Sequence, residues 1–138
     1  MQTYALASGV ERSSENLIHI ASKHISRKDA TEITDASAAT YTAAQILGGV
    51  IIRDPNGAGR TDVLPTAALL LGALSEDVVG QVIECLIVNN ADAAETITID
   101  AGTGGTITQI AATRIIPQNT SRKVYIRVDS ATAYTAWM

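Results

Sequence analysis

The sequence lacks most of the aromatic residues on which many binding proteins depend. It holds no phenylalanine, one tryptophan and four tyrosines, and aromatic residues make up 4% of the chain. A core must therefore be built from Ile, Val, Leu and Ala, and few side chains are available to stack on bases or sugar rings. The aromatic candidates for contacting a ligand are Tyr4, Tyr41, Tyr125, Tyr134 and Trp137.

Cysteine and histidine are also scarce. Cys85 is the only cysteine, so no internal disulfide can form, and its apolar neighbours predict a buried thiol rather than a nucleophile. His19 and His24 are five residues apart and do not share a helix face as a zinc-binding pair would. The sequence shows no P-loop, dinucleotide-binding or nucleophile-elbow motif. We therefore expect no enzymatic activity, no metal and no cofactor.

Basic charge is limited. The chain holds ten Lys and Arg against fourteen Asp and Glu, for a formal net charge of -4, and its basic residues form no patch. An acidic balance argues against direct binding to nucleic acid or to an anionic membrane surface. No apolar run is long enough to span a bilayer, and the start of the sequence does not have the pattern of a signal peptide. We expect neither nucleic acid nor membrane as a direct partner.

The sequence changes character at about residue 40. Residues 1–40 are rich in Ser, Thr, Ala and charged residues, with too few apolar positions to form a core. We expect an extended N-terminal arm that a partner orders, although the four-residue spacing of Leu17, Ala21 and Ile25 would also suit a short helix. The apolar residues of this arm are its candidate contacts: Leu17, Ile18, Ile20, Ile25 and Ile33.

Residues 41–138 have the pattern of a β-rich domain. Apolar and polar residues alternate in 96–100 and 123–129, and turn-forming residues separate shorter strands at about 50–53, 81–88, 106–110, 113–116 and 133–137. A helical turn is expected within 41–50, ended by Gly48 and Gly49, and a buried helix at 67–74. The predicted fold class is mostly β, an antiparallel β-sandwich or barrel with one short buried helix and an extended N-terminal arm.

The sequence 54–59, Asp-Pro-Asn-Gly-Ala-Gly, combines the strongest loop formers in the chain. Its two glycines are expected to adopt backbone angles that side chains resist. Charged residues bracket the loop and are expected to fix it by ion pairs, an interpretation we favour over a ligand site. The residues assigned to this structural loop are Arg53, Asp54, Gly57, Gly59, Arg60 and Asp62. Farther along, Glu84 interrupts an apolar strand, which favours an edge or interface position over a buried carboxylate.

The stretch 49–67, Gly-Val-Ile-Ile-Arg-Asp-Pro-Asn-Gly-Ala-Gly-Arg-Thr-Asp-Val-Leu-Pro-Thr-Ala, resembles small structural proteins of tailed bacteriophages. The resemblance continues into 87–90, 94–99 and the glycine-rich turn at 102–105, and it covers about 41–138. It implies a capsid decoration, or cement, protein that binds the major capsid protein on the outer capsid surface of a virion, as a homotrimer. The arm would then contact the capsid or a neighbouring subunit. A head-fibre or tail-associated adaptor, or a soluble ligand- or glycan-binding β module, are the alternative interpretations.

Overall fold

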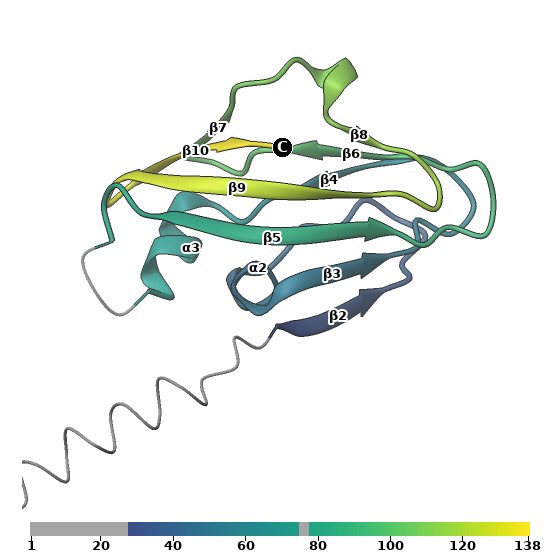
Figure 1. Ribbon diagram of the computed structural model, residues 1–138, viewed down its shortest axis with the longest axis horizontal. Coiled ribbons are helices and arrows are strands. Elements are labelled where there is room, and N and C mark those ends of the chain that lie inside the picture. Colours follow the sequence, from purple (N-terminus) through teal and green to yellow (C-terminus); the bar gives the residue numbers. More distant parts are fainter. Residues whose placement is uncertain (1–27, 75–77) are drawn as a thin grey trace, which may run out of the picture.

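The computed structural model describes residues 28–74 and 78–138, which form two β-sheets and two short α-helices (Figure 1). In chain order the elements are β2 (Asp29–Ile33), α2 (Ala43–Gly48), β3 (Gly49–Arg53), β4 (Arg60–Val63), α3 (Ala67–Gly72), β5 (Val82–Asn89), β6 (Ile97–Asp100), β7 (Gly105–Ile107), the 3-10 turn η1 (Ala111–Thr113), β8 (Ile115–Ile116), β9 (Ser121–Ser130) and β10 (Ala133–Trp137).

The predicted mostly β fold is confirmed, but its strand pairing is mixed rather than antiparallel throughout. The larger sheet has the order β2-β3-β5-β9-β10-β7, and the smaller sheet has the order β4-β6-β8. The pairs β2–β3, β3–β5, β4–β6 and β7–β10 are parallel, and the others are antiparallel. Short strands separated by turns look alike in sequence whether the chain returns as a hairpin or crosses to another sheet, so the pattern could not distinguish the two.

One core lies between the two sheets. The larger sheet contributes Ile51, Ile87 and Ile126, and the smaller sheet contributes Ile97 and Ile99, all with no exposed surface. Burial of each such aliphatic side chain stabilises the fold by about 1.5–3 kcal/mol. The alternation seen in the sequence thus places Ile97 and Ile99 of β6 and Val124 and Ile126 of β9 in a shared core, as the period of two predicts.

Helix α2 lies within the predicted stretch 41–50 and ends at the predicted glycines. Thr42 accepts a hydrogen bond from the Gln45 backbone N–H, and the Gln45 side chain accepts one from the Thr42 N–H, which together form a capping box. Gly49 ends the helix with a φ of +93°, a conformation that glycine adopts without strain. The same residue begins β3, so the helix passes directly into the strand.

Helix α3 differs from the fully buried helix predicted at 67–74. Ala67 and Leu70 are buried, but the Leu69 side chain is 64% exposed, and Leu71 only packs against the edge of the core. A helix that spans Ala67–Gly72 has fewer than two turns, so only one of its sides can face the sheets. The prediction based on this run of leucines therefore overestimated how much of the helix is buried.

The folded domain begins earlier than the boundary predicted at residue 41. Asp29–Ile33 forms β2, which pairs in parallel with β3 at the edge of the larger sheet. Ile33, predicted to contact a capsid or subunit, is partly buried and packs against the domain's own core. The other predicted contacts of the arm lie outside the described residues: Leu17, Ile18, Ile20 and Ile25.

Candidate functional site

A buried ion pair lies beneath the glycine-rich loop and joins the two sheets. Arg53, at the end of β3, places its Nε atom 2.7 Å from Oδ2 of Asp62 in β4, and both side chains have no exposed surface. Asp62 also accepts hydrogen bonds from the Tyr41 hydroxyl (2.8 Å) and the Ala39 backbone N–H (2.8 Å). Burial, followed by the charge of Asp62, raises the pKa of Tyr41 well above its usual value.

The remaining N–H groups of Arg53 hold the chain that connects β2 to α2. Its two terminal nitrogens donate to the backbone carbonyls of Asp35 (2.9 Å), Ser37 (2.6 Å) and Asp54 (2.6 Å). The second terminal nitrogen also approaches Oδ1 of Asp62 at 3.4 Å. Every donor of a guanidinium group is thereby used, which is the arrangement that makes a buried charge tolerable. This cluster therefore has a structural role: it holds the two sheets and the β2–α2 connection together.

The loop itself is tied mainly by backbone groups. Asp54 accepts a hydrogen bond from the Asn56 N–H at 2.9 Å, and the Arg60 Nε atom donates to the Pro55 carbonyl at 3.2 Å. Gly57 has a φ of +100° and donates its N–H to both carboxylate oxygens of Glu95 at 3.1 Å. Of the charged residues predicted to bracket the loop, Arg53 and Asp62 form an ion pair, whereas Asp54 and Arg60 bind backbone groups.

Gly59 serves a different purpose from the one predicted for it. Its backbone is not in the left-handed region, but a Cβ atom there would lie 3.0 Å from Oγ1 of Thr96. Close approach of the loop to the segment before β6, rather than an unusual angle, is what favours glycine at this position. Sequence reasoning missed Glu95 and Thr96 because they lie more than 35 residues from the loop that they contact.

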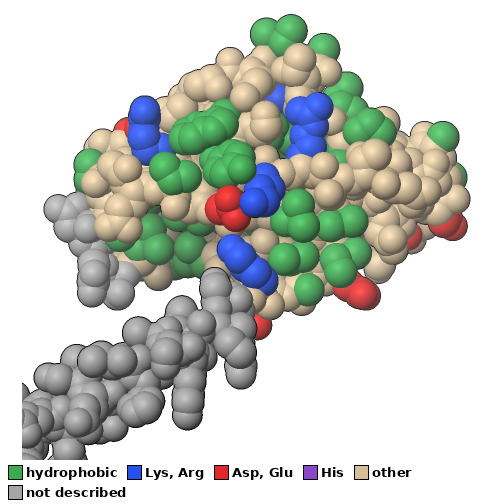
Figure 2. Space-filling model, in the orientation of Figure 1, with side chains coloured by type: hydrophobic (Ala, Val, Ile, Leu, Met, Phe, Trp, Pro, Cys, Tyr) green, Lys and Arg blue, Asp and Glu red, His purple; other side chains and the backbone are tan. Residues whose placement is uncertain are grey.

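The side of the larger sheet that faces away from the core is called here the outer face. It consists of the outward positions of β3, β5, β9 and β10, and no other part of the described chain covers it (Figure 2). Its aliphatic group is formed by two cross-strand pairs, Val50 opposite Leu86 and Ile52 opposite Val88, and all four side chains are partly exposed. Val82, farther along β5, is 50% exposed.

An aromatic group lies across the sheet from these aliphatic residues. The rings of Tyr125 in β9 and Trp137 in β10 are directly opposite each other and stack, with centroids 5.9 Å apart and an interplanar angle of 19°. The other aromatic candidates are placed differently. Tyr41 and Tyr134 are buried, and the Tyr134 hydroxyl donates to the Pro65 carbonyl at 2.9 Å, while Tyr4 lies outside the described residues.

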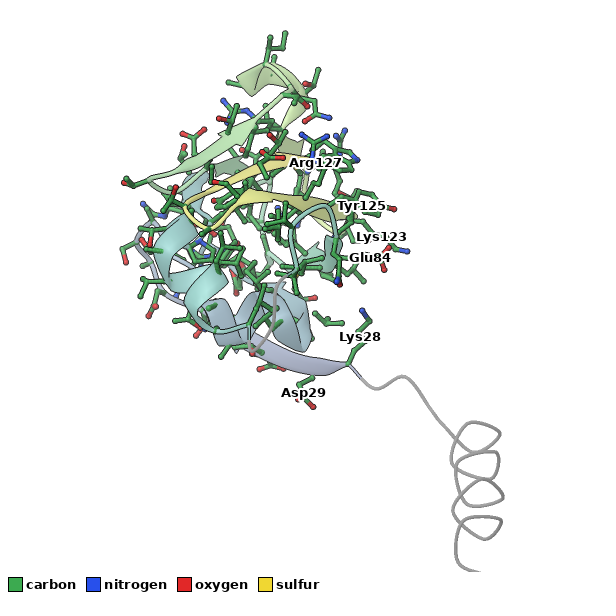
Figure 3. The ribbon with its side chains drawn as sticks, turned by 90° about the vertical axis from the view of Figure 1, so that its left-hand side faces the viewer. Lys28, Asp29, Glu84, Lys123, Tyr125 and Arg127 are labelled. Atoms are coloured by element: carbon green, nitrogen blue, oxygen red, sulfur yellow. The ribbon has the colours of Figure 1, made fainter. Side chains whose placement is uncertain are left out.

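Charged side chains separate the aliphatic and aromatic groups. Glu84 and Lys123 form an ion pair at 3.3 Å in the middle of the outer face, with 39% and 51% of their side chains exposed. Figure 3 shows both projecting from the same side of the sheet as Tyr125, Arg127 and Lys28. The sequence predicted an edge or interface position for Glu84. The structure places it on β5, an inner strand of the larger sheet, on the exposed face.

Arg127, at an outward position of β9, is paired with a neighbour on its own strand. Its Nε atom lies 2.7 Å from Oδ1 of Asp129. The other Asp129 oxygen accepts a hydrogen bond from the Thr135 hydroxyl at 2.6 Å, and these two hydrogen bonds lower the pKa of the Asp129 carboxyl. Asp129 is therefore ionised throughout the physiological range, and the pair bears little net charge.

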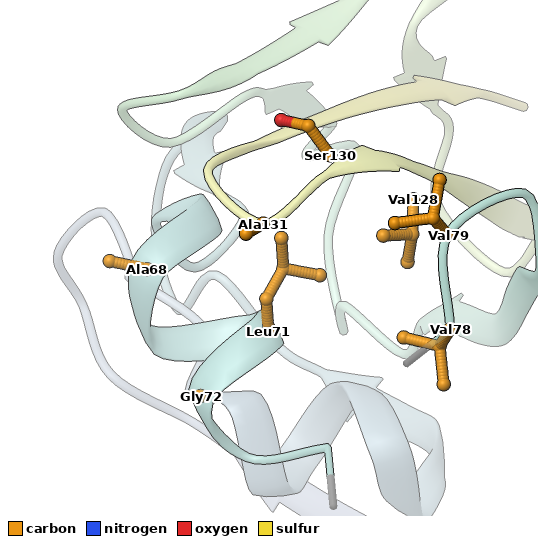
Figure 4. Close-up of a pocket in the computed structure, with 8 residues that line it drawn as sticks. All are labelled: Ala68, Leu71, Gly72, Val78, Val79, Val128, Ser130 and Ala131. Atoms are coloured by element: carbon orange, nitrogen blue, oxygen red, sulfur yellow. The ribbon is translucent and has the colours of Figure 1, made fainter. Parts of the chain in front are cut away.

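A hollow of about 620 Å³ lies between α3 and the turn that joins β9 to β10 (Figure 4). The described residues that line it are largely aliphatic, and among them only Ser130 has a side-chain hydroxyl. The small side chains at Ala68 and Ala131, and Gly72, leave the space that the larger Leu71 and Val128 border. Such a hollow could accommodate an apolar side chain, and none of the described residues that line it has an acidic, basic or thiol side chain.

The thiol of Cys85 points into the core. Burial raises its pKa to about 11, so the thiolate that a nucleophile or a metal ligand requires is disfavoured. Among the residues that the structure describes, no three His, Cys, Asp or Glu side chains gather in the manner of a metal site. Over the same part of the chain, no helix has the length and apolar character to cross a membrane.

Comparisons with known proteins add no relative. No protein-family model, no curated protein and no solved structure matches this chain.

Proposed function

We propose that this chain is a virion structural protein that decorates and stabilises the outer surface of a phage capsid by binding the major capsid protein. The sequence resemblance over 41–138 suggests this function, and the position of β2 is the structural observation that supports it. Among the described strands, β2 is an edge strand of the larger sheet, and residues 1–27 precede it in the chain. A segment with apolar residues is thus attached to an open sheet edge.

An open edge of this kind is suited to binding another chain. Within the described structure β2 pairs with β3 alone, so one side of its backbone is available to pair with a strand of a partner. The attached segment carries Leu17, Ile18 and Ile20 close together, with Ile25 nearer the domain. Burial of three aliphatic side chains contributes about 1.5–3 kcal/mol each before the cost of ordering the segment.

A cement protein also needs a domain that keeps its shape when the capsid is under strain. The satisfied ion pair of Arg53 and Asp62 joins the two sheets of this domain and the chain that follows β2. Three copies around a local symmetry axis, as the resemblance implies, would multiply contacts that are individually weak. Light scattering of the purified chain over a range of concentrations measures this oligomeric state, and a strict monomer both free and on the particle would contradict it.

Retention on particles that lack the native protein tests the proposed function. The full chain should bind to the capsid surface, and imaging of the decorated particle should show its density there. The variant Leu17→Ser/Ile18→Ser/Ile20→Ser should be retained at least about tenfold less well. Its control is Ser13→Ala/Ser14→Ala, which changes polar residues of the same segment. Density on a head fibre or tail would support the adaptor instead, and no retention of the full chain would refute the proposal.

A further inference from the structure

The strand register places two opposite charges at neighbouring positions of the outer face, so that two copies of this face can be complementary in charge. Glu84 of β5 and Lys123 of β9 occupy diagonal outward positions, because Glu84 is opposite Tyr125 and Lys123 is opposite Leu86. Diagonal positions of this kind are about 8 Å apart along the sheet surface. The face therefore presents a negative and a positive charge side by side between its aliphatic and aromatic groups.

We propose that a second copy of this chain packs against the outer face around a two-fold axis that passes between Glu84 and Lys123. For the same face of both copies to be in contact, the two-fold axis must lie in the plane of the interface, parallel to the two sheets. If the axis is perpendicular to the line that joins the two charges, Glu84 of each copy faces Lys123 of the other. Two ion pairs then form across the contact from groups that are already present and exposed.

The same axis matches the apolar groups of the two copies. With strands about 4.8 Å apart and residues about 3.3 Å apart, the aliphatic and aromatic groups lie on opposite sides of the Glu84–Lys123 line. Rotation about the axis leaves each group on its own side. Leu86 and Val50 then meet their counterparts in the second copy, and Tyr125 and Trp137 meet theirs. Strands of the two copies cross at a steep angle, as in orthogonal sheet packing.

The charge of this face favours a second copy over a nucleic acid or a membrane. Its exposed cations are Lys123 and Arg127, and Lys28 projects to the same side from before β2. These cations are accompanied by Glu84 in the centre and by Asp129 beside Arg127. A strongly anionic partner would meet the carboxylates as well as the cations. A second copy places each sign opposite its complement, and aromatic and arginine side chains are the residue types enriched in protein interfaces.

The size of the face indicates a weak association. Four strands and about four outward rows correspond to roughly 500 Å² of sheet per copy. Standard protein interfaces bury about 800 Å² on each partner, so we expect a dissociation constant in the range of about 10 µM to 1 mM. The inference concerns the purified chain in solution and does not depend on the proposed function. If the chain forms trimers, this contact joins two of them.

Sedimentation equilibrium of the full chain, from about 10 µM to 1 mM, tests the contact. The mass of the smallest stable species should double as the concentration rises. Glu84→Lys and Lys123→Glu should each weaken the doubling at least about tenfold, because like charges then face each other across the axis. An equimolar mixture of the two variants should restore it. In the mixed dimer the two positions are both acidic on one chain and both basic on the other, so opposite charges again face each other.

The matched control is Asp92→Lys, which makes the same charge change in an exposed loop and should leave the doubling unaltered. Because Glu84 and Lys123 are exposed, the melting temperature of each variant should stay within about 2 °C of that of the native chain. The proposal is overturned if the native mass never doubles. It is equally overturned if the mixture associates no better than the separate variants.

Discussion

The Nε atom of Arg53 lies 2.7 Å from Oδ2 of Asp62, and this fully buried pair joins the last residue of β3 in one sheet to β4 in the other. Neither charge is exposed to water, so each depends on the other and on surrounding hydrogen bonds. The pair therefore holds together elements that pack on opposite sides of the core.

Removal of one partner should destabilise the domain strongly. Asp62→Ala leaves the Arg53 charge buried without its counter-ion, and should lower the free energy of unfolding by about 3–5 kcal/mol. Tyr41→Phe removes only one hydrogen bond to the carboxylate and should cost about 1.5–3 kcal/mol. Urea denaturation with parallel circular dichroism measures both. The double replacement Arg53→Met/Asp62→Leu should lose less than Asp62→Ala, and an equal or larger loss would show that packing rather than charge dominates there.

Two neighbouring leucines of α3 should differ sharply in their contribution to stability. Leu70 has no exposed surface, so Leu70→Ala should cost about 2–5 kcal/mol. Leu69 is 64% exposed, and Leu69→Ala should change the free energy of unfolding by less than about 0.5 kcal/mol. Both substitutions remove the same atoms from the same helix, so thermal melts compare them directly. Similar losses at the two positions would contradict the orientation of α3.

The parts of the fold that sequence could predict are those with a local signal. The alternation at 96–100 and 123–129 gave β6 and β9, and Gly48 and Gly49 gave the end of α2. β2 was missed because an edge strand needs only one apolar side, and Ile33 is the only large apolar residue in Asp29–Ile33. β4 was missed because Asp62 occupies a core position that an apolar residue usually fills.

The same distinction applies to the candidate sites. Arg53 and Asp62 are close in sequence on either side of a loop, which made an ion pair between them a reasonable prediction. Their other partners, Tyr41 and the backbone of Ser37 and Ala39, come from a segment assigned mostly to the arm. The outer face was not predictable either. Its character depends on the register of β3, β5 and β9, which is a property of the assembled sheet.

Substitutions at two exposed, uncrowded glycines should reveal the cost of backbone strain by itself. A Cβ atom would contact nothing within 4 Å at Gly57 or at Gly72, but only Gly57 has a positive φ, +100°. Gly57→Ala should therefore cost about 1 kcal/mol from backbone strain alone. Gly72→Ala should be neutral or stabilising by up to about 1 kcal/mol, because alanine favours the helical conformation. Equal melting temperatures for the two variants would show that the loop relaxes freely around residue 57.

The Cys85 thiol should be protected from reagents until the domain unfolds. Its pKa is raised to about 11 by burial, so at pH 8 the folded chain should react with a disulfide reagent at least about a hundredfold more slowly than the urea-unfolded chain. The folded state prefers the neutral thiol. Its contribution to stability is complete below about pH 9, the ordinary pKa of a thiol, and declines as the pH rises through about 11. Rapid reaction of native protein at pH 8 would contradict the burial of this residue.

Two truncations should define where the domain begins. Removal of residues 1–27 ends before β2 and should leave the far-ultraviolet circular dichroism and the melting temperature of the domain close to those of the full chain. Removal of residues 1–40 should be far more damaging, because it deletes β2 and the carbonyls of Asp35 and Ser37 that accept hydrogen bonds from Arg53. It also deletes the Ala39 N–H that binds Asp62. With both members of a buried ion pair left short of partners, we expect a loss of at least about 3 kcal/mol. Equal stability of the two truncated proteins would mean that residues 28–40 contribute nothing to the fold, whereas a collapse of both would place part of 1–27 in the domain.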